Sequence, residues 1–236
     1  MHILAFDTCF DALSVAVARA QAQDVHVLLE RSEPRRPGHA ERLLPLVVEA
    51  LEALNLSFAE VGRIAVTRGP GSFTGVRTGV AAARALALAI GCPAVGVECL
   101  AAIAPDARAQ LGAVAAGRPL GVALDARSGL VYFQLFEATG EAREGALLLS
   151  APACAERLGQ APAIVVGSAA ALVAQAAAAL GGHAEARLPE AEPRAGWVAR
   201  LGATLAPGEP LKPLYLRTPD AKPQTGYALP RIPPRC

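Results

Sequence analysis

The stretch AFDTCFDALSVAVA (residues 5–18) recurs in outline as ALDARSGLVYFQLF (residues 123–136). Each copy has an apolar run, an aspartate (Asp7 or Asp125), a short polar turn and a second apolar run. Short apolar runs bounded by turns are typical of buried β-strands joined in a hairpin. A strand, an aspartate, a turn and a second strand are a common pattern, so the similarity of the two copies could also arise by chance without duplication. Because each copy also opens a run of strands followed by helices, we predict two similar α/β lobes.

The rest of the chain repeats that order of strands and helices. In the first half, strands are expected at residues 2–6, 12–19, 25–31, 63–68 and 93–98, and helices at 39–54 and 75–90. In the second half, a strand–turn–strand unit is expected at 119–138, strands at 146–151 and 163–170, and helices at 171–180 and 195–205. We therefore expect a first lobe over residues 1–104, a second over 105–217 and a proline-rich tail over 218–236.

Composition argues against several classes of protein. The formal net charge of the 236 residues is +1, which argues against strong nucleic-acid binding by the chain alone. The longest apolar stretch, residues 79–91, is broken by Arg84 and is too short to span a bilayer. The N-terminus reaches Asp7 before the apolar region of a signal peptide could form, so we expect a cytoplasmic protein without a membrane contact. Five cysteines without a CxxC pair favour reduced thiols over disulfides or a zinc site.

The loop GPGSFTGVRTG (residues 69–79) follows a predicted strand and opens a helix. A P-loop requires Lys and then Ser or Thr after its second glycine, but Val76 and Arg77 follow Gly75 here. The dinucleotide spacing GxGxxG is also missing, and Ser72 lacks the flanking glycines of a nucleophile elbow. Because the N-terminus of a helix presents free N–H groups, anion binding stays open as an interpretation.

Asp7 and Thr8 stand where a strand enters a tight turn, and Asp125 stands at the matching place in the second copy. Two interpretations are open. Either these turns approach a phosphate, as in a nucleotide-using phosphotransferase, or the side chains cap their own turns through local hydrogen bonds.

Small residues and one leucine gather near one face of the helix expected at 75–90, namely Gly75, Gly79, Ala82, Ala83 and Leu86. Glycine costs about 1 kcal/mol relative to alanine inside a helix, so two glycines need a reason. This face either packs on the protein's own sheet or receives a helix of a partner. The amphipathic helix expected at 39–54 has a leucine stripe that would suit such an interface.

Residues for catalysis are few. The four histidines are scattered and form no HxxxH or HExxH motif, which makes a metallopeptidase the least favoured function. His39, at the start of a helix, is interpreted as a cap or surface residue. No base for Ser72 or for any cysteine is evident in the sequence.

Five segments resemble, in this order, the TsaB (YeaZ) family of bacterial proteins required for threonylcarbamoyladenosine in tRNA. They are ILAFDTCFDALSVAV, GHAERLLP, GPGSFTGVRTGVAAARALALAIGCPAVGV, ALDARSGLVYFQLF and PLYLR. The resemblance runs from Ile3 to Arg217 and leaves PQTGYALPRIPPRC uncovered. It implies an actin/Hsp70-like fold of two RNase H-like lobes.

The resemblance also implies a subunit without a catalytic role of its own. The catalytic relative TsaD carries a metal-binding HxxxH after the strand that follows the glycine-rich helix. Cys99 and Ile103 stand at those two positions here, so neither a metal site nor a cofactor is expected. The turns at Asp7, Thr8 and Asp125 are then vestiges of a nucleotide site.

The partners implied by the resemblance are TsaD, the ATPase TsaE and, when TsaD is missing, a second copy of the chain. The complex transfers the threonylcarbamoyl group from its adenylate to the adenosine beside the anticodon. The resemblance implies that this chain contacts tRNA only within that complex. The helices at 39–54 and 75–89 are expected to form the contact with TsaD. The interface residues expected on them are Leu43, Leu46, Val47, Ala50, Gly75, Val76, Gly79, Ala82, Ala83 and Leu86.

Overall fold

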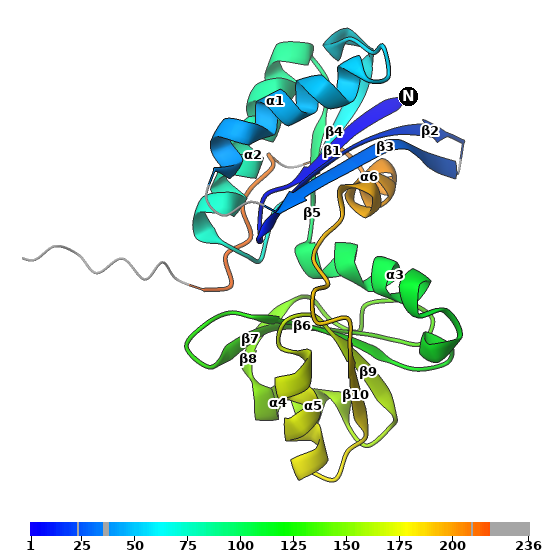
Figure 1. Ribbon diagram of the computed structural model, residues 1–236, viewed down its shortest axis with the longest axis vertical. Coiled ribbons are helices and arrows are strands. Elements are labelled where there is room, and N and C mark those ends of the chain that lie inside the picture. Colours follow the sequence, from blue (N-terminus) through cyan, green and yellow to red (C-terminus); the bar gives the residue numbers. More distant parts are fainter. Residues whose placement is uncertain (23, 35–37, 209, 218–236) are drawn as a thin grey trace, which may run out of the picture.

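The computed structural model describes residues 1–22, 24–34, 38–208 and 210–217. Two lobes, each built on a five-stranded sheet, lie one above the other with helix α3 (Cys99–Leu111) between them (Figure 1). The predicted tail over 218–236 lies outside the described residues.

The first sheet has the strand order β3-β2-β1-β4-β5. Its strands are β1 (His2–Asp7), β2 (Ala12–Gln21), β3 (Asp24–Pro34), β4 (Val61–Thr67) and β5 (Ala94–Val97). The first three strands form an antiparallel meander, whereas β4 and β5 run parallel to β1. Leu4 of β1 stands opposite Val17 of β2 and Ile64 of β4.

Helices cover both faces of the first sheet. On one face, α1 (His39–Glu52) and α2 (Phe73–Ile90) pack against Leu4 and Phe6. On the other face, α6 (Ala195–Thr204) packs against Ile3 and Ala5 (Figure 1). Because side chains alternate along a strand, β1 is buried on both sides, which is why its sequence is an unbroken apolar run up to Asp7.

The second sheet repeats the topology of the first. Its order is β8-β7-β6-β9-β10. The elements are β6 (Leu120–Asp125), β7 (Leu130–Phe136), β8 (Leu147–Ser150), α4 (Ala151–Leu158), β9 (Ala163–Val166), α5 (Ala170–Ala179) and β10 (Ala184–Arg187). The meander of three strands is again followed by two strands parallel to the first. The same order in both sheets confirms the predicted duplication and the actin/Hsp70-like α/β fold.

Two elements differ from their predicted form. The segment 151–158, for which the sequence pattern predicts no helix, forms α4, and Ser150 caps it by accepting a hydrogen bond from the Ala153 N–H. The strand β10 is likewise not predicted, because its four residues, AEAR, carry no apolar run. The short 3-10 helices Phe58–Glu60 and Gly112–Ala115 complete the described elements.

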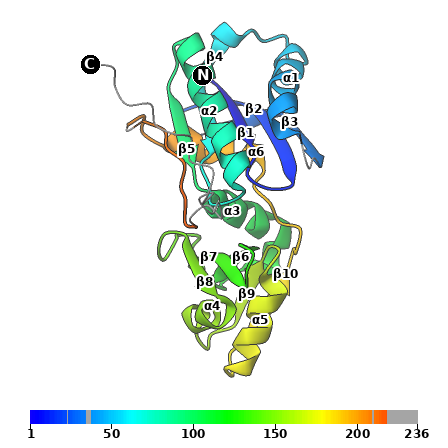
Figure 2. The ribbon, with the colours of Figure 1, turned by 90° about the vertical axis from the view of Figure 1, so that its left-hand side faces the viewer.

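Helices α3 and α6 tie the two lobes together. The buried side chains of Leu100 and Ile103 on α3 belong to a core that reaches both sheets. The Trp197 Nε1–H of α6 donates a hydrogen bond to the Asp106 carboxylate of α3 at 2.8 Å. The lobe boundary predicted after residue 104 falls inside α3, and α6 returns from the second half of the chain to the first sheet (Figure 2).

Among the described residues, α2 is the one helix long and apolar enough to cross a membrane by length and composition alone. That is weak evidence for a membrane span, because a core helix of a folded protein meets the same criterion. Here Val76, Val80 and Ala83 of α2 are buried in the core of the first lobe.

Candidate functional site

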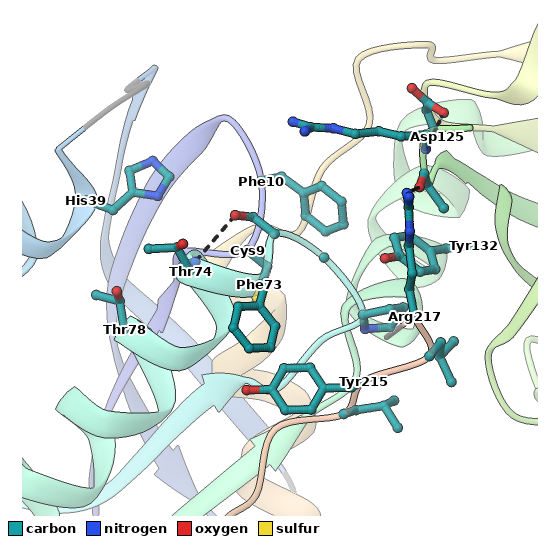
Figure 3. Close-up of a pocket in the computed structure, with 18 of the residues that line it drawn as sticks. Cys9, Phe10, His39, Phe73, Thr74, Thr78, Asp125, Tyr132, Tyr215 and Arg217 are labelled. Carbon is teal, nitrogen blue, oxygen red and sulfur yellow. Dashed lines mark hydrogen bonds between the residues drawn. The ribbon is translucent and has the colours of Figure 1, made fainter. Parts of the chain in front are cut away.

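A cavity of about 820 Å³ opens between the lobes. The first lobe contributes the β1–β2 turn at Cys9 and Phe10, the start of α1 and the glycine-rich loop with the start of α2. The second lobe contributes the β6–β7 turn at Asp125 (Figure 3). Residues 212–217, which we call the C-terminal strap, complete the lining with Leu214, Tyr215 and Arg217. We refer to this cavity as the interlobe cleft.

The Asp7 side chain points into the protein. It is fully buried and is absent from the lining of the cleft. Its Oδ1 accepts hydrogen bonds from the Cys9 N–H at 3.2 Å and from the Thr67 hydroxyl, whereas Oδ2 is buried without a partner. Loss of hydration raises the pKa of Asp7 to about 7, against the hydrogen bonds that lower it. Asp7 therefore holds its proton through the mildly acidic range.

The glycines of the loop at 69–79 make room for the β1–β2 turn. A Cβ on Gly75 would lie 2.0 Å from the Thr8 carbonyl oxygen, and one on Gly79 would lie 2.5 Å from Thr8 Oγ1. The Thr8 hydroxyl donates to the Gly75 carbonyl at 2.7 Å, and the Ser72 N–H donates to the Cys9 carbonyl at 2.8 Å. These glycines thus allow two backbone segments to touch.

The second predicted turn faces the cleft. Asp125 is exposed, and its Oδ1 accepts a hydrogen bond from the Arg127 N–H at 2.8 Å. The Asp125 N–H donates to the Ser168 hydroxyl at 2.9 Å. The two aspartates of the duplicated motif thus have opposite surroundings, because Asp7 is fully buried whereas Asp125 is exposed and lines the cleft.

Aromatic rings and the strap define the cleft further. Phe73 and Tyr215 stack with ring centroids 5.0 Å apart, and Arg77 lies over the Phe73 ring at 5.2 Å. The Leu214 N–H donates to the Arg68 carbonyl at 2.6 Å in the first lobe. Arg217 donates to the Ala126 carbonyl and the Ser128 hydroxyl in the second. The strap therefore connects both lobes across the cleft.

His39 begins α1 and faces the β1–β2 turn. Its Nδ1 lies 3.2 Å from the Thr8 carbonyl oxygen and its Nε2 lies 3.4 Å from the Asp11 carbonyl oxygen. Because both neighbours are acceptors, whichever nitrogen carries a proton donates to the turn. His39 thereby holds the turn against the first helix.

Beneath the cleft, Asp7, Cys9 and Cys99 bring one ligand atom each to within 4.8 Å of one another. All three side chains are fully buried. Burial raises the pKa of both thiols, which therefore stay protonated. Ile103, one helical turn beyond Cys99, packs in the core and has no atom that could bind a metal.

The residues predicted to meet a partner are mostly inside this chain. Only Ala82 and Leu86 keep partial exposure. The buried ones are Leu43, Leu46, Val47, Ala50, Gly75, Val76, Gly79 and Ala83. The correction has a simple cause: the leucine stripe of α1 and the small face of α2 cover the sheet and the β1–β2 turn of their own lobe.

The outward face of α2 carries a different set of apolar residues. The Leu88 side chain is 86% exposed and that of Leu44 on α1 is 48% exposed. Ala81, Ala85 and Ala89 are also exposed on α2. The sequence signal for this face is the apolar run from Ala85 to Ile90, which continues beyond the buried side of the helix although Arg84 precedes it.

Comparisons with known proteins agree on the family. Residues 34–188 match the family model described as TsaD: tRNA N6-adenosine threonylcarbamoyltransferase. The chain is 39% identical over 137 residues to the tRNA threonylcarbamoyladenosine biosynthesis protein TsaB of Escherichia coli, a match that covers 58% of this chain and 55% of that protein. The chain thus spans about half the length of this TsaB relative.

Other relatives match over nearly the full chain. An uncharacterised protein of Mycobacterium tuberculosis is 36% identical over 226 residues, which cover 94% of each chain. The solved structure of YeaZ from Pseudomonas aeruginosa superposes with a TM-score of 0.74 at 27% identity and covers 91% of this chain and 100% of that one. The family model, the TsaB relatives and the YeaZ structure together show that the chain belongs to the TsaB (YeaZ) family.

Proposed function

We propose that this chain is a non-catalytic cytoplasmic subunit for the formation of threonylcarbamoyladenosine in tRNA. In this proposal it supports a TsaD-family partner and the ATPase TsaE, meets tRNA only in that complex, and pairs with a second copy when TsaD is absent. Family membership and the names of the TsaB relatives support the pathway. The single observation that supports docking is the apolar outer face of α2.

The outer face of α2 is better suited to packing against a helix of a partner than to exposure to solvent. Its exposed residues include Ala81, Ala85, Ala89 and the large Leu88 near the C-terminal end, with Arg77 and Arg84 exposed beside them. Small side chains let a second helix approach closely, and a leucine supplies apolar area. The proposal therefore keeps α1 and α2 as the docking helices. The contact is assigned to their exposed faces and not to the buried residues predicted from the sequence.

Docking is tested with Leu88→Arg and the matched control Leu172→Arg, which changes an exposed leucine of α5 in the other lobe. Sedimentation of each protein alone, and mixed with TsaD from the same organism, measures both contacts. We expect Leu88→Arg to weaken self-association and TsaD binding at least about tenfold, because a buried unpaired charge costs more than 1.4 kcal/mol. Equal loss in both variants, or in neither, would refute this surface.

The non-catalytic part of the proposal rests on the chemistry of the described residues. By the family resemblance, Cys99 and Ile103 stand where TsaD carries its metal-binding histidines, and Asp7 is buried and does not line the cleft. The chain alone, given threonylcarbamoyl-adenylate and tRNA, is expected to form no modified adenosine until TsaD is added. Product formation by the chain alone would contradict the proposal.

A nucleotide site in the cleft is the alternative function. Asp125 and the start of α2 both line the cleft, which is the specific observation in its favour. Magnesium-dependent ATP binding that is lost in Asp125→Ala and kept in Asp106→Ala, a variant outside the cleft lining, would support it.

A further inference from the structure

Three side chains distant in sequence meet beneath the interlobe cleft. Asp7 ends β1, Cys9 lies in the turn that follows, and Cys99 is the first residue of α3. Their carboxylate oxygen and two sulfur atoms all lie within 4.8 Å of one another. None of the three side chains has measurable exposure. The fold therefore builds an enclosed cluster of three ligand-type atoms.

One oxygen of the cluster has no partner. Asp7 Oδ1 is held by the Cys9 N–H and the Thr67 hydroxyl, but the buried Oδ2 accepts no hydrogen bond from any described residue. A buried polar atom without a partner costs about 1–3 kcal/mol, and more if it is charged. An unpartnered oxygen on a carboxyl that belongs to this enclosed cluster indicates that the cluster accommodates something further.

The donor set selects the class of ligand. Two thiolates and one carboxylate suit zinc, whereas magnesium and calcium prefer sites made of oxygen alone. With the usual Zn–S and Zn–O lengths, the ligand atoms of a tetrahedral site lie roughly 3.3–3.8 Å apart. The three atoms therefore need only a small inward movement. We propose that Asp7, Cys9 and Cys99 bind one thiophilic divalent cation of the zinc class.

Thr67 orients two of the three ligands. Its hydroxyl donates to Asp7 Oδ1, and its oxygen lies 3.2 Å from Cys9 Sγ. The Cys99 backbone is fixed as well, because its N–H donates to the Gly69 carbonyl at 2.9 Å. Partners of this kind hold metal ligands in place in known sites. Thr67 is thus a positioning residue for the proposed site.

Binding is a proton exchange. Both thiols are protonated in the metal-free chain, since burial raises the pKa of Cys9 and of Cys99. The cation displaces both thiol protons, and the Asp7 proton where it is present, and these protons pass to solvent. No oxidant or reductant is needed. Because the site is enclosed, the cation enters most readily while the chain folds.

Cobalt(II) is the probe for the experiment, because thiolate–cobalt bonds give a charge-transfer absorption that other ligands lack. The full chain is stripped with a chelator under a phosphine reductant. Cobalt is then offered both to the folded chain and during refolding. We expect one cobalt per chain with the charge-transfer band, displaced by zinc. A chain that shows no band by either route would overturn the proposal and leave a buried water as the partner of Asp7.

Variants assign the ligands. Cys99→Ala and the isosteric Asp7→Asn should lose the cobalt band or the stoichiometric binding, and Thr67→Val should weaken binding about 10–100-fold. The matched control is Cys154→Ala, which removes a buried thiol of α4 in the other lobe and should bind cobalt as the wild type does. If Cys99→Ala does not fold, the cobalt binding of Asp7→Asn decides whether the cluster is the binding site. Undiminished binding in folded Asp7→Asn, or equal loss in Cys154→Ala, would overturn the assignment.

Discussion

At the scale of single residues, the contact between Thr8 and Gly75 determines how the β1–β2 turn meets α2. The Thr8 hydroxyl donates to the Gly75 carbonyl, and the space for a Gly75 side chain is filled by the Thr8 carbonyl. Gly79 meets Thr8 in the same way. A bulky residue at Gly79 would therefore disturb the fold itself.

Gly75→Ala is expected to destabilise the chain by about 1–3 kcal/mol, because its Cβ forces backbone atoms apart in a packed core. Chemical unfolding of wild type and variant measures the difference. Gly145→Ala is the control, since a Cβ there meets no atom within 4 Å, and its effect should stay within about 0.5 kcal/mol. Equal effects at the two positions would show that the close approach to Thr8 does not decide stability.

At the scale of elements, the C-terminal strap is hydrogen-bonded to both lobes and so links them outside the two sheets. It adds no strand to a sheet among the described residues, yet it bonds to Arg68 in one lobe and to Ala126 in the other. The guanidinium of Arg217 supplies the contacts to the second lobe. We therefore interpret the strap as a restraint on the spacing of the lobes.

Arg217→Ala is expected to speed amide hydrogen exchange in the β6–β7 turn about tenfold, since hydrogen bonds from a charged group contribute about 1.5 kcal/mol or more. Mass-spectrometric exchange on peptides that contain residues 124–130 measures the change. Lys212→Ala, in the strap but exposed, is the control and should leave the turn unchanged. Unaltered exchange in Arg217→Ala would contradict a restraining role.

At the scale of the whole molecule, one hydrophobic cluster reaches both lobes, beside a separate cluster in each lobe. The cluster that contains Leu4 and Phe6 of the first sheet extends through Ile103 of α3 to Leu120 and Val122 of the second. A continuous core of this kind couples the stability of its parts. We therefore expect the lobes to unfold together in spite of their duplicated topology.

Ile103→Ala is expected to lower the free energy of unfolding by about 2–5 kcal/mol and to keep a single transition. The fluorescence of Trp197, the one tryptophan, reports on α6 and its contact with α3 between the lobes, and far-UV circular dichroism reports on both lobes. Coincident curves are the expected outcome. Val114→Ala, at an exposed valine, should change little. Separate transitions would show that the lobes are independent units.

The sequence by itself determined the duplicated α/β architecture, because unbroken apolar runs such as Ile3–Phe6 fix strands that are buried on both faces. It also determined the family, because the family motifs are short stretches whose residues and order can be read directly from the sequence. Sequence could not tell whether the small-residue face of α2 packs inside the chain or against a partner, because small side chains suit both and only the approach of the Thr8 turn decides.

Only the tertiary structure brought Asp7 and Cys9 to Cys99, some ninety residues away in the chain. Spacing rules find metal ligands that lie close in sequence, and these three do not follow such a rule. The structure likewise gave the two aspartates of the duplicated motif different surroundings. Asp7 is fully buried, whereas Asp125 faces the open cleft. Burial depends on the elements that pack over a residue, and a local pattern does not contain that information.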